Sequence, residues 1–219
     1  DNFCLAGGCA LNSKLNGILK RKTKFKNIFI QPNAGDGGGS LGAAMYVCSK
    51  LKDYDNLKKN NNKVYLGPSF SNSEIQNIIK HREDLKNLSI ENLNDDKINN
   101  LLAKKIFENC IIGWFKGSME WGPRALGNRS ILANPTNHKI KDILNLKIKL
   151  REKFRPFAPA ILEEHQTDYF DLDYHSPFMM NVVNAKDKAK KEVPSVVHVD
   201  NTCRVQTVRR EENKQFYDL

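Results

Sequence analysis

Long apolar runs, CxxC cysteine pairs and the sequence pattern of a cleavable leader are all missing from this sequence. No apolar run approaches the roughly 20 residues that a membrane-spanning helix needs, so we expect no membrane association. The first residues, DNFCLAGGCALN, do not have the pattern of a signal peptide. None of the five cysteines forms a CxxC pair, which favours free thiols in a cytoplasmic protein over a disulfide framework or a zinc site. Cys4, Cys9 and Cys48 lie among apolar residues and are predicted to be small core residues.

The chain also lacks an initiator methionine. It starts directly on an apolar strand pattern and stops at YDL without an obvious closing element. We therefore expect an excerpt of a longer protein, with an N-terminal part of the same chain missing. Its oligomeric state stays open, and a homo-oligomer is possible.

The composition is that of a globular protein that binds anions. Of the 219 residues, 40% are hydrophobic and 27% are charged, which excludes a disordered chain. The net charge of +10 implies an anionic partner: nucleic acid, a membrane surface or a phosphorylated small molecule. No nucleic-acid-reading motif is visible, so a small molecule is favoured.

Most of the positive charge lies in one segment. Residues 116–155 contain ten Lys or Arg against three acids, and so hold seven of the ten net charges. Glycine, proline and aromatic residues interrupt this segment, beginning with GWFKGSMEWGPRALGNRSILANP. The mixture favours a site for several negative charges on a compact ligand, although a solvated basic surface is the alternative.

The first part of the chain predicts a layered α/β unit. Strands at 3–6 and 28–30 are each followed by a glycine turn and a helix, at 9–21 and 41–51. Such turns suit phosphate, but neither is a Walker loop, and tight packing explains the glycines equally well. Asp36, in the second turn, is either a helix cap or a ligand for a divalent cation.

The second part predicts an α+β unit with a mixed or antiparallel sheet. Residues 52–63, KDYDNLKKNNNK, are interpreted as a linker. Helices are expected at 73–82, where Ser71 and Glu74 make a capping box, at 95–109, and at 140–148 after the cap candidates Thr136 and Asn137. Strands are expected at 90–93, 110–115, 158–162, 178–183, 195–199 and 202–208.

The basic segment offers guanidinium groups suited to phosphate. Arg124, Arg129 and Ser130 lie beside glycine and proline breaks, and arginine makes planar bidentate contacts that lysine cannot. Lys147, Arg151 and Arg155 follow at steps of four residues. They would share one solvated face of a helix, but Pro156 disfavours a helix that continues through Arg155. Ser13, Ser130 and the cysteines lack a visible paired base, which argues against a covalent nucleophile.

Several long motifs together resemble the carbamoyltransferases, the family of nodulation-factor and antibiotic O-carbamoyltransferases. They are LAGGCALNSKLNG, IFIQPNAGDGGGSLGAA, GPRALGNRSILANP, KIKLREKFRPFAPAIL, SPFMM and HVDNTCRVQTV. These motifs extend in the family's order from about residue 3 to about residue 208. Trp121 and Asn134 stand where many members of the family have Phe and Asp, which removes no charge-binding group.

The resemblance implies two domains and two reactions. Residues 1–51 would end an N-terminal domain of the actin/Hsp70-like (ASKHA) superfamily, and residues 64–219 would form most of a domain resembling threonylcarbamoyl-adenylate synthase (YrdC-like). ATP and carbamoyl phosphate would react in the second domain to give carbamoyl adenylate. The first domain would pass the carbamoyl group to a hydroxyl of a small-molecule acceptor, sugar-containing or a natural product.

The resemblance also implies roles for individual residues. Catalytic roles fall on Arg124, Arg129, Lys147 and Arg155, and binding of ATP and carbamoyl phosphate on Asn128, Ser130, Arg151, Arg204 and Gln206. Gly7, Gly8, Asn12 and Gly37 would contact carbamoyl adenylate, and Asp36 a divalent metal, iron or magnesium. The family's HxxxH metal ligands are absent from this sequence. A basic nucleotide- or nucleic-acid-binding module without catalysis remains the alternative.

Overall fold

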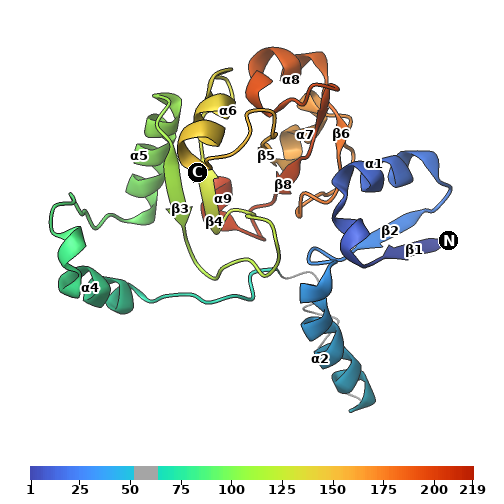
Figure 1. The fold of residues 1–219 in the computed structure, drawn as a ribbon, viewed down its shortest axis with the longest axis horizontal. Coiled ribbons are helices and arrows are strands. Elements are labelled where there is room, and N and C mark those ends of the chain that lie inside the picture. The colour runs from blue at the N-terminus through green and yellow to red at the C-terminus, as the bar shows by residue number, and fades with distance from the viewer. Residues whose placement is uncertain (52–63) are drawn as a thin grey trace.

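A computed structural model describes residues 1–51 and 64–219, so the predicted linker lies outside the described residues. The described chain is a mixed α/β structure whose strands form four separate two-stranded sheets. Figure 1 shows the first elements beside those near the C-terminal end, with α2 and α4 projecting from the body. The broad class is therefore as predicted, but no single large sheet forms among the described residues.

The two strand–turn–helix units at the start of the chain are confirmed. Strand β1 (Asn2–Leu5) pairs in parallel with β2 (Asn27–Ile30), and the helices are α1 (Ser13–Lys22) and α2 (Gly39–Lys50). Each glycine turn begins a short 3-10 helix, at Gly8–Leu11 and Asp36–Gly38.

The two following helices begin at side-chain caps. In α4 (Asn72–His81), Ser71 and Glu74 form the predicted capping box, in which the Glu74 carboxylate accepts from the Ser71 N–H at 2.7 Å. Helix α5 (Asp95–Phe107) is capped by Asn94 and ends before Asn109, whose φ is 67°. A short 3-10 helix, Glu83–Leu85, lies between them, and residues 90–93 form no strand, contrary to the prediction.

The small sheets differ from the expected strands. Strand β3 (Ile112–Phe115) pairs antiparallel with β4 (Arg129–Leu132), which was not predicted because the arginine and glycines around it obscure the strand pattern. β5 (Ala160–Leu162) pairs in parallel with β8 (Gln206–Val208), and β6 (Val183–Asn184) pairs antiparallel with β7 (Thr202–Cys203). The prediction of a strand at 195–199 was wrong. Residues Pro194–Val196 form a 3-10 helix instead, because proline is favourable at the start of a helical turn.

The helix expected at 140–148 ends before the run of basic residues does. It comprises α6 (Ile140–Ile143) and a π-helical turn (Leu144–Ile148), and the chain then turns at Leu150, where φ is 49°. It therefore ends before Arg155, as Pro156 indicated. Neither predicted cap serves it: the N-cap is Lys139, which makes no side-chain cap hydrogen bond. The remaining elements are a 3-10 helix at Glu163–His165, α7 (Gln166–Tyr169), α8 (Asp187–Glu192) and α9 (Lys214–Asp218).

Helix α1 packs directly on the backbone before β6. Asn16, fully buried, donates to the carbonyl of Met180 at 2.9 Å, and the N–H of Val182 donates to the carbonyl of Ser13 at 3.0 Å. A Cβ on Gly17 would lie 2.1 Å from the Val182 carbonyl oxygen, so only glycine permits this approach. This contact joins the first 22 residues to the C-terminal half and creates the site described below.

Two apolar clusters stabilise the structure. The larger contains seven buried residues around the β6–β7 sheet: Phe170, Leu172, Val183, Ala185, Ala189, Cys203 and Val205. The smaller joins Ala10 and Ala34 to Met180, across the same contact as α1. Predicting Cys4, Cys9 and Cys48 as core residues was wrong: Cys4 and Cys9 are exposed and Cys48 is partly exposed, because β1 and α2 are covered on few sides in the described chain.

Candidate functional site

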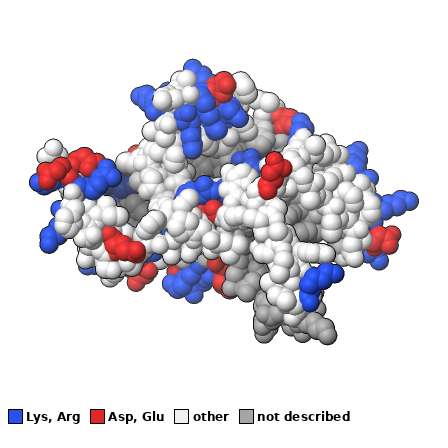
Figure 2. All heavy atoms as spheres, turned by 60° about the horizontal axis from the view of Figure 1, so that its bottom comes forward, with Lys and Arg blue, Asp and Glu red and all other residues white. Residues whose placement is uncertain are grey.

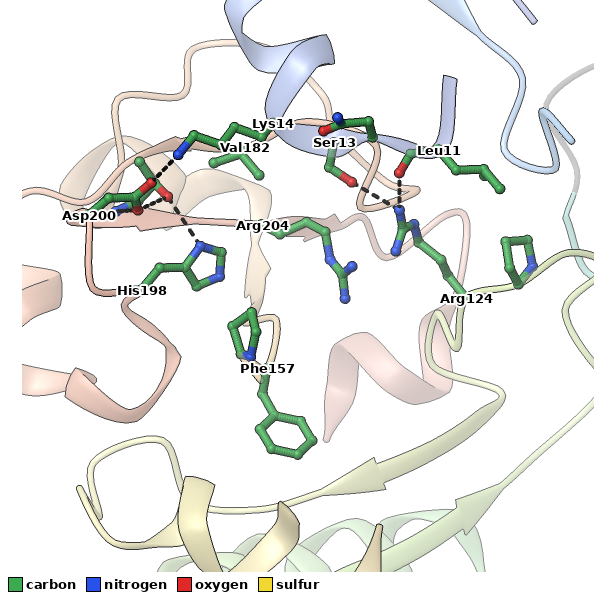
Figure 3. A pocket seen from close by; sticks show the side chains of 13 residues that line it. Leu11, Ser13, Lys14, Arg124, Phe157, Val182, His198, Asp200 and Arg204 are labelled. Carbon is green, nitrogen blue, oxygen red and sulfur yellow. Dashed lines mark hydrogen bonds and ion pairs between the residues drawn. The ribbon is translucent and has the colours of Figure 1, made fainter. Parts of the chain in front are cut away.

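A cavity of about 480 Å³ lies where the start of α1 meets three loops of the C-terminal half. The loops are the one after Glu120, the one before β5, and the turn between the 3-10 helix at Pro194–Val196 and β7. Figure 3 shows the side chains that surround it. The lining residues are Leu11, Asn12, Ser13, Lys14, Pro123, Arg124, Pro156, Phe157, Val182, His198, Asp200, Thr202 and Arg204.

The loop that carries Arg124 is built around the buried carboxylate of Glu120. One oxygen of this carboxylate accepts from the backbone N–H groups of Leu126 at 2.6 Å and Asn128 at 2.8 Å. Its other oxygen lies 3.3 Å from Nε of Arg129. Because a charged acceptor makes strong hydrogen bonds, this residue fixes the backbone on the far side of Arg124.

The loop's carbonyl groups are held equally closely. The Leu126 carbonyl accepts from Nε2 of Gln206 at 2.8 Å and from the Tyr65 hydroxyl at 3.0 Å, and the Gly127 carbonyl accepts from the Trp114 indole at 2.6 Å. Gly127 has a φ of 106°, and a Cβ there would meet Phe216 at 2.4 Å. The loop is thus rigid before any ligand binds.

Buried positive charges converge on the cavity. Arg124 donates from Nη2 to the Ser13 hydroxyl at 2.9 Å and to the Leu11 carbonyl at 3.0 Å, and burial lowers its pKa. Burial and the charges of Arg124 and Arg151 lower the pKa of Arg204 to about 10. Figure 3 shows the guanidinium groups of Arg124 and Arg204 pointing into the same space. Such an arrangement is stabilised when an anion lies between the cations.

Arg151 reaches this region through a second rigid loop. Asn145, fully buried, accepts from Nε of Arg151 at 2.7 Å and donates to the carbonyl of Arg155 at 2.9 Å. The Arg151 guanidinium also lies 5.0 Å from the centre of the Phe157 ring, which lines the cavity. A single asparagine therefore shapes the basic loop between the π-helical turn and Pro156.

A chain of hydrogen bonds forms the opposite wall. Lys14 Nζ lies 2.7 Å from the Asp200 carboxylate, whose other oxygen accepts from the Thr202 hydroxyl at 2.6 Å. The hydrogen bond from Lys14 and that from Thr202 lower the pKa of Asp200 to about 2. The Thr202 hydroxyl in turn lies 3.1 Å from Nδ1 of His198. Lys14 belongs to α1, so both halves of the described chain contribute to this wall.

The two ends of the chain match two models of one protein family. The family model described as Carbamoyltransferase C-terminus matches residues 103–219, and that described as Carbamoyltransferase N-terminus matches residues 1–45. The chain belongs to the carbamoyltransferase family. The resemblance that the sequence motifs suggested is therefore confirmed.

Curated relatives cover the whole chain. Nodulation protein NolO of Bradyrhizobium diazoefficiens is 39% identical over 99% of this chain and 39% of its own length. Nodulation protein U of Rhizobium tropici is 34% identical over 100% of this chain and 35% of its own length. An uncharacterized protein of Synechocystis sp. is 39% identical over 100% of this chain and 39% of its own length. The chain thus spans about two fifths of the length of these relatives.

Several of the predicted site residues of this carbamoyltransferase chain lie on the cavity and others support it. Arg124, Arg204 and Asn12 line it, and Arg151 lies behind Phe157. Asn128, Ser130 and Gln206 use their side chains within the protein: Asn128 donates to the Ser118 carbonyl at 2.7 Å, and Ser130 accepts from the Gly127 N–H at 3.1 Å. Arg129 contacts Glu120 and the Gly122 carbonyl instead of the cavity.

Other predicted residues lie away from the cavity lining. Lys147 and Arg155 are exposed, and Arg155 lies 3.7 Å from the carboxylate of Glu152. Gly7, with a φ of 95°, donates to the Ala34 carbonyl at 2.8 Å, next to the exposed Gly8. A Cβ on Gly37 would lie 2.7 Å from the Asn33 side chain, so close packing is enough to explain a glycine at this position. Their assignment to ligands stays a prediction.

The metal prediction rests on Asp36 alone. Its carboxylate is exposed in the first turn of its 3-10 helix, and it is not the N-cap, which is Gly35. Across residues 1–51 and 64–219, no three His, Cys, Asp or Glu side chains are grouped closely enough to hold a metal ion. The described residues could therefore supply only one ligand, the Asp36 carboxylate, to a metal ion. In the same ranges, no helix is both long enough and apolar enough to cross a bilayer.

Six residues that form or support the site were not predicted from the sequence. Lys14, His198, Asp200 and Thr202 form one wall, and Glu120 and Asn145 fix the loops opposite. His198, Asp200 and Thr202 belong to HVDNTCRVQTV, a motif from which only Arg204 and Gln206 had been selected. The run of small polar residues in it was a usable signal. Lys14 offered none, because its partner Asp200 lies 186 positions away.

Proposed function

We propose that this chain is the carbamoyl-activating part of an ATP-dependent O-carbamoyltransferase. Carbamoyl phosphate would be hydrolysed to phosphate and carbamate, and a carbamate oxygen would attack the α-phosphorus of ATP. The bond from that phosphorus to the bridging oxygen breaks, pyrophosphate leaves and carbamoyl adenylate forms. A hydroxyl of a small acceptor then takes the carbamoyl group and releases AMP. The small-molecule acceptor is what the resemblance to the carbamoyltransferases implies.

The observation that carries the proposal is the convergence of Arg124 and Arg204 on one cavity, with the charge of Arg151 close by, next to the ring of Phe157. Burial and mutual repulsion lower the pKa of Arg204 to about 10, so the arrangement is unfavourable without an anion. Phosphate and pyrophosphate groups carry the charge that would relieve this repulsion. Rigid loops hold the cations before the reaction, which is the condition for stabilising charge as phosphate groups leave.

The remaining roles divide by position. Arg124 and Arg204 would bind phosphate directly, with Asn12 at the rim, and Arg151 would add positive charge next to Phe157. Arg129, Asn128, Ser130 and Gln206 would act by holding the loop of Arg124. Lys147 and Arg155, on exposed segments, would reach a phosphate only by side-chain movement.

Domain identity and the transfer site are part of the same proposal. Residues 1–51 would belong to an ASKHA-type transfer domain and residues 64–219 to a YrdC-like domain, in a cytoplasmic protein. The glycine turns at Gly7, Gly8 and Gly37 would face carbamoyl adenylate, and Asp36 would add one ligand to an iron or magnesium site. The N–H groups and helix starts at these turns are suited to such a ligand.

Pyrophosphate release by the full-length protein tests this proposal. With ATP and carbamoyl phosphate, the wild type should release pyrophosphate, and Arg124→Ala and Arg204→Ala should each lower the rate by about a hundredfold or more. Arg210→Ala is the matched control, because Arg210 pairs with Asp218 at 3.0 Å outside the cavity lining. Turnover that persists in both cavity variants contradicts the proposal. Salt-sensitive oligonucleotide binding without turnover would instead favour a nucleic-acid-binding module.

A further inference from the structure

Three residues that line the cavity each have a buried side-chain nitrogen without a hydrogen-bond partner among the described residues. Within the described residues, seven buried side-chain N or O atoms lack a hydrogen-bond partner, and three of these belong to residues that line the cavity. They are Nε of Arg124, Nε of Arg204 and Nε2 of His198. Since buried polar groups are normally hydrogen-bonded, these three indicate a bound polar ligand. Arginine Nε is always a donor. Whether Nε2 of His198 is a donor or an acceptor therefore decides which hydrogen-bonding group the ligand needs there.

The hydrogen-bond chain along the wall determines the tautomer of His198. The Asp200 carboxylate can only accept hydrogen bonds. The Thr202 hydroxyl therefore uses its one proton to donate to Asp200, at 2.6 Å. Thr202 can then only accept from the imidazole, which places the ring proton on Nδ1, 3.1 Å away. Nε2 of a neutral ring is left as an acceptor. Figure 3 shows this ring next to Arg204 and Phe157.

The surroundings keep the ring neutral. Burial lowers the pKa of His198, and although the charge of Asp200 opposes this, the charges of Arg204, Lys14 and Lys141 add to it. A histidine with a pKa below its usual value of about 6.5 carries no charge at neutral pH. The residues that line the cavity therefore carry two unpaired donors from arginine and one unpaired acceptor from histidine.

We propose that His198 selects the carbamoyl group, with Nε2 accepting a hydrogen bond from its NH₂ while Arg124 and Arg204 bind the attached phosphate. This inference rests on the proposed function. A carbamoyl phosphate has both features, an anionic end for the guanidinium groups and an N–H donor for the imidazole. Acetyl phosphate has the same anionic end and a methyl group of similar size in place of NH₂, and would leave Nε2 unpaired.

Discrimination between these two molecules tests the role of His198. In the full-length protein, acetyl phosphate is used as a competitor of carbamoyl-phosphate-dependent pyrophosphate release. We expect the ratio of its inhibition constant to the KM of carbamoyl phosphate to fall by about tenfold to a hundredfold in His198→Leu, because the unpaired acceptor is removed. His198→Gln keeps an acceptor and should retain part of the ratio. His81→Leu, on the exposed face of α4, is the control and should change nothing.

A ratio unchanged in His198→Leu overturns the inference, and so does a ratio near one in the wild type. Thr202→Val provides a second test that keeps the histidine. It removes the acceptor of Nδ1–H, so the ring loses its fixed tautomer and the ratio should fall by a smaller factor. This positioning effect would not appear if His198 only filled space.

A spectroscopic measurement separates this inference from the proposed function. In full-length protein labelled with ¹⁵N-histidine, His198 should show the neutral Nδ1–H tautomer at pH 7, assigned by comparison with His198→Gln. Carbamoyl phosphate should shift its Nε2 resonance much more than acetyl phosphate does. If pyrophosphate release fails but these shifts appear, the proposed reaction is wrong and the recognition stands. An imidazolium, an Nε2–H tautomer or equal shifts overturn the recognition itself.

Discussion

At the scale of single residues, a buried acid organises a basic site. Glu120 has only 4% of its surface exposed, and its carboxylate binds backbone N–H groups as well as Arg129. By charge alone it was one of three acids opposing ten cations. Glu120 neutralises Arg129, whereas no acid among residues 1–51 and 64–219 forms an ion pair with Arg124 or Arg204. The free anion-binding capacity of the segment is therefore smaller than its composition suggests, and lies in the cavity.

We predict that Glu120→Gln destabilises the full-length protein. The amide supplies one carbonyl acceptor without the charge, so the N–H groups of Leu126 and Asn128 are held more weakly and Arg129 loses its counter-charge. A loss of about 1–3 kcal/mol is expected from hydrogen bonds to a charged group. Urea unfolding measures it.

Glu91→Gln, at an exposed position outside the cavity, is the control for this loss. It should leave the midpoint unchanged. Equal midpoints for Glu120→Gln and the wild type would show that the carboxylate does not hold the loop.

At the scale of elements, the site depends on two close approaches: α1 against the chain before β6, and the basic loop against Asn145. Neither is an interaction between neighbours in sequence. Ser13 and Lys14 reach the cavity only because α1 packs on Val182, and Arg151 lies next to the cavity-lining Phe157 only because Asn145 turns the chain.

We predict that Gly17→Ala separates α1 from the backbone beneath it. The added Cβ would lie 2.1 Å from the Val182 carbonyl oxygen, so one of the two segments must move. Overpacking of this kind costs about 1–3 kcal/mol, which thermal unfolding detects as a lower Tm. Pyrophosphate release should fall as well, since the cavity loses part of its wall.

The control for this substitution is Gly113→Ala in β3, where a new Cβ would meet nothing within 4 Å. It should be neutral or stabilising by about 0.5–1 kcal/mol. If both variants behaved alike, the close packing of α1 would be refuted.

We predict that Asn145→Ala loosens the basic loop. It removes the hydrogen bonds to the carbonyls of Lys153 and Arg155 and the acceptor of Arg151. Trypsin should then cut faster within residues 149–155, and the KM of carbamoyl phosphate should rise by about tenfold, the effect of a lost charged hydrogen bond.

Asn137→Ala, on the segment before α6, serves as its control and should change neither quantity. An Asn145→Ala variant with wild-type proteolysis would mean that the loop is held by other contacts.

At the scale of the whole molecule, the charge is divided into groups. Figure 2 shows Lys and Arg in several separate groups on the face drawn, which is hollowed near its centre, with uncharged surface between them. A binder of extended nucleic acid would more often present a continuous basic face. Both halves of the described chain contribute to the cavity, so the site is a property of the assembled molecule.

A group of ion pairs whose strength depends on pH lies near the C-terminal end of the chain. His175 contacts Glu163 through Nδ1 and Glu212 through Nε2, and Arg209 binds the same Glu163 carboxylate at 2.6 Å. Burial disfavours the charged ring, but the hydrogen bond to Glu212 and the two carboxylate charges outweigh it and raise the pKa of His175. The hydrogen bond from Arg209 lowers the pKa of Glu163, which keeps it ionised.

We predict that His175→Gln is most destabilising in mildly acidic solution. A raised folded-state pKa means that the contribution of His175 is fully present below the unfolded value of about 6.5 and is lost as pH rises through the folded value. The Tm difference from the wild type should be larger at pH 6 than at pH 9. His81→Gln, exposed on α4, should show no such trend. A difference that grows with pH contradicts the assignment.

The sequence by itself determined the local units and the family. Ser71 and Glu74 specified their capping box, Pro156 indicated the end of the basic helix, and the motifs identified the carbamoyltransferases, because each signal lies within a few neighbouring residues. The tertiary structure decided which cations face the cavity. Glu120 neutralises Arg129, and Lys14 meets an aspartate 186 positions away. Such pairings depend on how distant segments pack, which no local pattern of charge or apolar residues encodes.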